Sequence, residues 1–178
     1  AAVPLLIQSL GDSVADVRLS AALTLGGLGA VAADSVERLT SLLNDPVTSC
    51  RQAAVNALGA IGPVAVETTQ ALAEAARKDH RKVRAAACRA LGAIGQPNDE
   101  VLTALVAALS DKDVAVRCQA TRSLGGFGIG RSDVVSGLKG VLSDEAADVR
   151  GHAVVAIAAI PEAINDSVAD LVNAIADP

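Results

Sequence analysis

Two arginines, Arg89 and Arg122, stand 33 residues apart in a chain of net charge −5. A guanidinium group is a planar fork of N–H donors that fits a carboxylate or a phosphate, and arginine is a frequent anchor at protein interfaces. Two such groups on neighbouring structural units would repel each other unless something anionic or planar covered them. They predict a partner-binding site, although two solvated side chains would also explain the pattern. The polar residues expected to flank the pair are Gln52, Asn56, Gln119 and His152.

A second basic cluster lies near the middle of the chain, immediately before Arg84. Basic patches can hold phosphate backbones or acidic partners, whereas a basic run at a turn is more often simply solvated. No Phe, Tyr or Trp lies among these residues, so stacking on nucleic-acid bases is not available to them. The cluster is kept as a secondary candidate and consists of Arg77, Lys78, His80, Arg81 and Lys82.

The residue patterns of common catalytic and metal sites are missing. The chain has no HExxH, GxSxG or glycine-rich phosphate loop. Its two histidines are too far apart to share a metal or a triad, and Cys50, Cys88 and Cys118 show no CxxC spacing. We expect no catalytic residue, no metal and no cofactor. Cys118, at an outward position, is the thiol to test for reactivity.

The elements that must position these residues are repeated every 33 residues. Arginine recurs in one register, with alanine three residues later, then a large aliphatic residue, and two glycines in four of five copies. The columns are Arg18, Arg51, Arg84, Arg117 and Arg150; Ala21, Ala54, Ala87, Ala120 and Ala153; Leu25, Leu58, Leu91, Leu124 and Ile157; Gly26, Gly59, Gly92 and Gly125; and Gly29, Gly62, Gly95 and Gly128. Five columns in one register indicate a true structural repeat.

Each repeat contains two helical patterns. The first has apolar residues three and four positions apart, as in Leu102, Leu105 and Leu109, which is typical of one helix face. The second runs from about Asp16 to Leu28 in the first copy. The glycines after it are typical of helix caps, because glycine adopts the left-handed conformation without strain. In the fifth copy both glycines are lost, so its second helix is expected to end with a different cap.

An acid lies between the two helices of each repeat. It is Asp12, Asp45, Asp111, Asp144 or Asp177, and in the third repeat Lys78 takes the position while the acid moves to Asp79. Such an aspartate can cap the following helix. The arginine six residues later should lie near the same corner of its layer. A ladder of Asp–Arg contacts from layer to layer is predicted, and a structural role for this arginine column is favoured over a functional one.

The motif V-R-x-x-A-x-x-x-L-G-x-[IL]-G, complete at residues 83–95, resembles the HEAT-repeat family and, within it, the bilin-lyase-like HEAT repeats. The resemblance implies an all-α, right-handed solenoid of stacked antiparallel helix pairs. We expect a single solenoid over residues 1–178, with five repeats at about 1–33, 34–66, 67–99, 100–132 and 133–165 and the first helix of a sixth at 166–178. The TPLH turn of ankyrin, the aromatics of tetratricopeptide repeats and the third helix of armadillo units are missing.

The resemblance also implies that the second helices line the concave face, where solenoids bind partners. We therefore expect a non-catalytic protein-binding scaffold or adaptor whose partner is another protein. Two alternatives remain open: a bilin-lyase-like subunit that handles a tetrapyrrole or its acceptor protein, and a nucleic-acid-binding HEAT-like protein. The lack of aromatics weakens the first alternative, and net acidity weakens the second, so nucleic acid is not an expected partner.

Three further expectations concern the setting of the chain. No apolar run reaches the length of a membrane span, and unpaired cysteines suit a cytoplasmic location. The first residue is Ala1 rather than Met, which is typical of a fragment or a processed form. The last helix would expose apolar residues through which a second copy could associate, namely Val168, Leu171, Val172 and Ile175.

Overall fold

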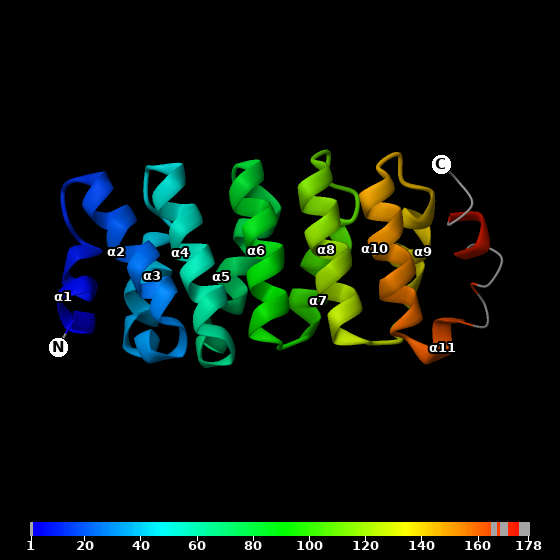
Figure 1. Ribbon diagram of the computed structural model, residues 1–178, viewed down its shortest axis with the longest axis horizontal. Coiled ribbons are helices and arrows are strands. Elements are labelled where there is room, and N and C mark those ends of the chain that lie inside the picture. The colour runs from blue at the N-terminus through cyan, green and yellow to red at the C-terminus, as the bar shows by residue number, and fades with distance from the viewer. Residues whose placement is uncertain (1, 165–166, 168–170, 175–178) are drawn as a thin grey trace.

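The computed structural model describes residues 2–164, 167 and 171–174, and it shows a row of stacked helices (Figure 1). The second helices stand side by side along the long axis of the molecule; they are α2 (Ala15–Leu28), α4 (Thr48–Ile61), α6 (Arg81–Ile94), α8 (Val114–Phe127) and α10 (Ala147–Ala158). The first helices are α1 (Ala2–Ser9), α3 (Val36–Leu42), α5 (Thr69–Lys78), α7 (Asp99–Ala108) and α9 (Ser132–Gly140). The shorter elements are η1 (Gly29–Ser35), η2 (Gly62–Thr68), η3 (Val141–Ser143) and α11 (Pro161–Ile164). The described residues contain no strand, so the predicted all-α solenoid is confirmed.

The buried core follows the repeat columns. The large aliphatic column of the second helices is buried throughout, from Leu25 to Ile157. The first helices bury the matching positions Leu39, Leu72, Leu105 and Leu138. Because alanine, valine and leucine fill nearly all of this interior, the layers can pack closely along their whole length. The predicted sixth helix, 166–178, falls largely outside the described residues, as do Val168, Ile175 and Asp177; of that segment, Val172 is exposed.

The two glycine columns have different roles. Gly29, Gly62, Gly95 and Gly128 end the second helices with positive φ angles. Gly95 and Gly128 adopt the predicted left-handed conformation, whereas Gly29 and Gly62 combine the positive φ with ψ of −136° and −141°. In the fifth copy α10 ends at Ala158, and the cap residue that follows, Ala159, has a φ of −79°, which is ordinary right-handed helix. The other column lies inside the helices: a Cβ added to Gly125 would lie 2.7 Å from the Cα of Ala156 on the next second helix. Those glycines therefore do not act as caps but allow neighbouring second helices to approach closely.

The predicted ladder of Asp–Arg contacts is confirmed across four layer junctions. Arg117 donates from Nε and Nη2 to the carboxylate of Asp144 at 2.7 and 2.8 Å, and from Nη1 to the carbonyl of Asp111 in its own layer at 2.9 Å. Each arginine therefore ties its own turn to the turn of the next layer. The other three pairs are Arg18–Asp45, Arg51–Asp79 and Arg84–Asp111.

The turn aspartates do not cap helices directly, which corrects one detail of the prediction. The Oδ1 of Asp144 accepts from the backbone N–H of Ala146, the residue before α10, at 2.9 Å. Burial alone would raise the pKa of Asp144, but the hydrogen bonds from Arg117 and from this N–H hold it below its usual value. The aspartate stabilises the turn and accepts hydrogen bonds from the arginine, so both residues of each ladder pair have a structural role.

The segment Ala15–Leu42 is long and apolar enough to cross a membrane when judged by length and composition alone. In the structure it is not one straight helix, because α2 ends at Leu28 and the chain turns through Gly29, with φ of 57°. The 14 residues of α2 extend about 21 Å at 1.5 Å per residue, whereas a bilayer core is about 30 Å thick. The folded segment forms parts of two repeats.

Candidate functional site

A hollow of about 480 Å³ lies over α4, α6 and α8, on the face formed by the second helices. We call it the second-helix groove. It brings together four of the six residues predicted for the main site, and it adds two from the secondary basic cluster. Its polar lining consists of Gln52, Asn56, Arg81, Lys82, Arg89, Asp113 and Gln119.

A smaller hollow of about 260 Å³ lies next to this groove, between α6 and α8. Arg89 and Gln119 line both hollows, and Arg122 lines the smaller one. The floor between the two arginines is made by small residues, including Gly92 and Gly126. The predicted neighbouring position of Arg89 and Arg122 is therefore realised, with open surface between them.

The cations of this surface are only partly neutralised. Arg89 donates from Nη2 to the Oδ1 of Asn56 at 2.6 Å, which orients the guanidinium but leaves its charge uncompensated. Arg81 lies 3.4 Å from Asp113, a carboxylate that also accepts from the N–H of Ala115 at the start of α8. Within the described part of the chain, Lys82 and Arg122 have neither a hydrogen bond from the side chain nor an ion pair. The groove is thus a positive surface on an acidic chain.

The secondary basic cluster is divided by the structure. Arg77 lies 3.5 Å from Glu100, and Lys78 lies 2.9 Å from Glu74 one helical turn away. The Nδ1 of His80 accepts from the N–H of Lys82 and caps α6. These three residues are therefore occupied at the turn, whereas Arg81 and Lys82 belong to the second-helix groove.

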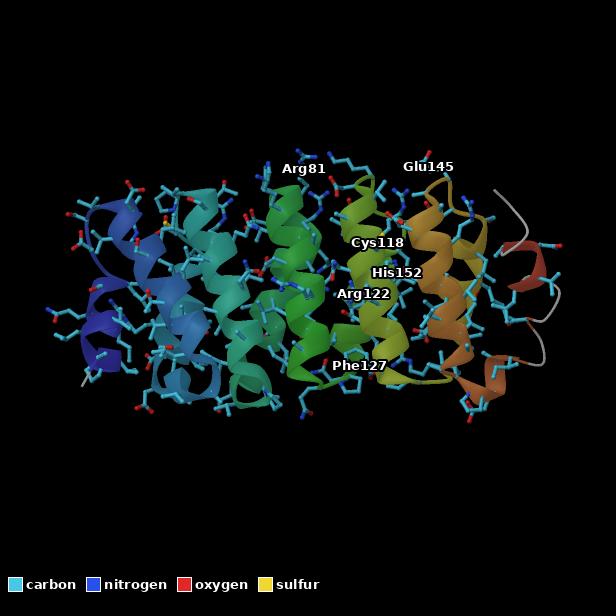
Figure 2. The ribbon with its side chains drawn as sticks, in the orientation of Figure 1. Arg81, Cys118, Arg122, Phe127, Glu145 and His152 are labelled. Atoms are coloured by element: carbon cyan, nitrogen blue, oxygen red, sulfur yellow. The ribbon has the colours of Figure 1, made fainter. Side chains whose placement is uncertain are left out.

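Cys118 and Arg122 lie on α8, and His152 lies on the next second helix, α10 (Figure 2). His152 lines neither of the two hollows, and its Nδ1 is buried with no hydrogen-bond partner among the described residues. Burial and the nearby Asp148 raise the pKa of the Cys118 thiol, and burial raises that of Cys88 to about 12. Such thiols stay protonated near neutral pH, so neither is an activated nucleophile. The described residues contain no cluster of three or more His, Cys, Asp or Glu residues able to hold a metal.

Two features of this surface were not predicted from the sequence. Arg81 and Lys82 were assigned to a turn, yet Lys82 lies seven residues before Arg89, a spacing that puts both on one helix face. This seven-residue spacing is visible in the sequence and could have placed Lys82 beside Arg89. Ala53 and Ala86 occupy the same repeat position as Gln119, which lines the groove, yet both alanines are buried.

The fold and this groove define a helical-repeat solenoid with a polar, mainly basic surface on one face. The family model described as HEAT repeats matches residues 3–92, 69–158 and 102–178, which together span nearly the whole sequence. The chain belongs to the HEAT-repeat family. The search of curated proteins gave no significant match.

Similar solved structures include natural and designed solenoids. The complex of CpcE and CpcF of phycocyanin lyase from Nostoc sp. is 26% identical with a TM-score of 0.66, covering 87% of this chain and 97% of that chain. A designed armadillo repeat protein in complex with the peptide (KR)4 is 18% identical with a TM-score of 0.73, over 89% and 81% of the two chains. An engineered protein is 22% identical with a TM-score of 0.75, over 96% and 85%. The last two comparisons show the shared fold alone.

Proposed function

We propose that this chain is a protein-binding module that holds an acidic segment of a partner protein in the second-helix groove. The observation that carries the proposal is the contrast between its arginines. Those of the ladder are each paired with an aspartate, whereas Arg89 and Arg122 face open surface and have no carboxylate partner among the described residues. A partner carboxylate would supply the missing charge.

Two further points support this function. Gln52, Asn56 and Gln119 line the groove with amide groups, which can both donate to and accept from the main chain of a bound segment. A designed armadillo repeat protein with a similar fold is in complex with a basic peptide. Here the groove itself carries the cations, so electrostatic complementarity favours an acidic ligand.

A charge-reversal variant tests the proposal. Arg89→Glu combined with Arg122→Glu should reduce the affinity for a fluorescein-labelled acidic peptide by at least about a hundredfold, since two charge-assisted contacts become repulsive. Fluorescence anisotropy at low and at physiological salt measures the affinity. Circular dichroism should show unchanged helicity, because both side chains are exposed.

The matched control is Arg38→Glu combined with Lys112→Glu. Both residues are exposed and lie outside the two hollows, and the pair changes the net charge by the same amount. It should bind the peptide nearly as well as the unaltered chain. An equal loss of affinity in both double variants would mean that overall charge, and not the groove, determines binding, and the proposal would then be rejected.

A second candidate function is a bilin-lyase-like subunit. It is favoured by the CpcE–CpcF complex of phycocyanin lyase, because 97% of that chain aligns with this one at 26% identity. Against it stands the composition: Phe127 is the one Phe, Tyr or Trp in the sequence, so aromatic side chains to line a tetrapyrrole pocket are lacking. Incubation with bilin should leave the visible absorption spectrum of the pigment unchanged. A shifted absorption band would favour the lyase-like function.

A further inference from the structure

The second-helix face changes character along the molecule. One position recurs on each second helix, on the side that forms the groove; it is exposed on four of these helices, and on α4 its residue, Asn56, is half-buried. Read from α2 to α10, this row contains an apolar residue, an amide, two arginines and another apolar residue: Leu23, Asn56, Arg89, Arg122 and Val155. Leu23 and Val155 are 55% and 69% exposed, which is high for large apolar side chains. The two ends of the row therefore differ chemically from its centre.

Charged residues beside this row show the same pattern. The position seven residues earlier holds Asp16 on α2, Lys82 on α6 and Asp148 on α10. Both aspartates are exposed, and neither makes a side-chain hydrogen bond or an ion pair within the described residues. They would repel a carboxylate at the two ends of the face. Positive charge is thus confined to α6 and α8, and a ligand that is acidic throughout would fit poorly.

We propose, resting on the function proposed above, that the ligand is an extended segment with two central carboxylates and an apolar side chain at each end. The carboxylates lie over Arg89 and Arg122, and the apolar side chains cover Leu23 and Val155. Asn56 faces a polar residue between the first apolar side chain and the first carboxylate. This arrangement assigns the composition and the register of the partner segment.

The spacing of the layers determines the register. Packed helices lie about 8–10 Å apart. A polyproline II segment advances about 3.1 Å per residue with three residues per turn, so every third side chain points the same way at intervals of about 9.3 Å. One layer therefore corresponds to three ligand residues. Contact with all five second helices requires a segment of about thirteen residues, with apolar side chains first and last and acids at the seventh and tenth positions.

Synthetic peptides test this register with the intact chain. The reference peptide has leucine at both ends, glutamate at the seventh and tenth positions, and proline at several intervening positions. A second peptide has the same composition with the two glutamates adjacent. A third has the glutamates in place and serine for both leucines. The reference should bind at least about tenfold more tightly than either altered peptide, with each leucine contributing about fivefold.

Protein variants give the complementary measurement. Leu23→Ser and Val155→Ser should each weaken binding of the reference peptide about fivefold and leave binding of the serine peptide unchanged. Both side chains are exposed, so these substitutions should not disturb folding. Leu5→Ser is the matched control, since Leu5 is equally exposed but lies on the first helix α1. It should leave all affinities unchanged.

The outcomes separate the register from the function on which it rests. If the arginine double variant abolishes binding but all acidic peptides bind equally well, the groove binds acidic segments and the proposed register is wrong. If a helical peptide with glutamates seven residues apart, about 10.5 Å along its axis, binds more tightly than the reference, the extended conformation is wrong. If the arginine double variant binds normally, the proposed function itself fails.

Discussion

The ladder contact between Arg117 and Asp144 should be the strongest single link between two layers. The two side chains are each 8% exposed, the lowest combined exposure among the ladder pairs. Asp144 accepts two hydrogen bonds from Arg117 and one from the N–H of Ala146. Asp144→Ala removes all three and leaves Arg117 with its carbonyl contact to Asp111 and a longer contact to the exposed Glu145.

The expected cost follows from these contacts. Hydrogen bonds to charged groups contribute about 1.5–3 kcal/mol each, and removing one partner of a buried pair costs about 3–5 kcal/mol. Some of this is recovered, because the site is at the surface and water can reach the freed guanidinium. We expect a loss of about 3 kcal/mol in the free energy of unfolding. For a chain of this size that corresponds to a fall of about 6–12 °C in Tm.

Thermal unfolding followed by circular dichroism at 222 nm measures the effect. Glu74→Ala serves as the control, because it breaks the exposed pair with Lys78 and should leave Tm within experimental error. The double variant Arg117→Met with Asp144→Ala should be less destabilised than the sum of the two single variants, which establishes direct coupling. A Tm for Asp144→Ala within about 2 °C of the unaltered chain would refute the view that the ladder joins the layers.

Three other predictions concern the ladder aspartates, the packing of the second helices and the cysteines. In urea titrations, the free energy of unfolding should decrease as the pH is lowered from about 5 to 3. The ladder aspartates of the folded chain hold pKa values below the unfolded value of about 3.9, so the unfolded chain takes up protons first. Constant stability across this range would contradict the depressed pKa values. Gly125→Ala should destabilise the chain by about 1–3 kcal/mol, since the added Cβ would lie 2.6 Å from the Cβ of Ala156. Gly126→Ala should be neutral or stabilising, because no atom lies near its added Cβ. Equal unfolding midpoints for the two variants would contradict the close approach of α8 and α10. Iodoacetamide at pH 7.5, followed by mass spectrometry, should label Cys118 slowly and leave Cys88 unlabelled until the chain unfolds, while rapid labelling of folded Cys88 would show that its thiol is not protected.

The sequence predicted those features that depend on repetition. The predicted ladder includes the third repeat, where the turn acid is displaced by one residue to Asp79, and Arg51 reaches this carboxylate at 2.7 Å. The cap glycines and the buried leucines follow from the same register. What a helical wheel could not predict was the burial of Ala53 and Ala86, since this depends on how closely the next helix approaches.

The candidate site was predictable in part for a related reason. Residues on different second helices, such as Arg89 and Arg122, are brought together by the repeat itself, so their proximity could be inferred. Arg81 and Lys82 stand at the first positions of α6, where a sequence pattern separates turn from helix poorly. His152 occupies the repeat position of Gln119 but does not line the hollows, because these lie over α4, α6 and α8 and His152 is on α10.

The arginines of the ladder stabilise the stacking of the layers, whereas those of the second-helix groove are available to a ligand. A ladder arginine is held by hydrogen bonds on two sides, so its charge is unavailable to a ligand. The residue type at the repeat position of Arg122 differs between repeats, and Arg122 itself is exposed and unpaired within the described residues. It can therefore be replaced without disturbing the packing of the layers. Ladder variants should therefore lower Tm while the folded fraction keeps its affinity, and groove variants should lower affinity at constant Tm. A variant of Arg122 that lowered both would show that the two sets of arginines are coupled.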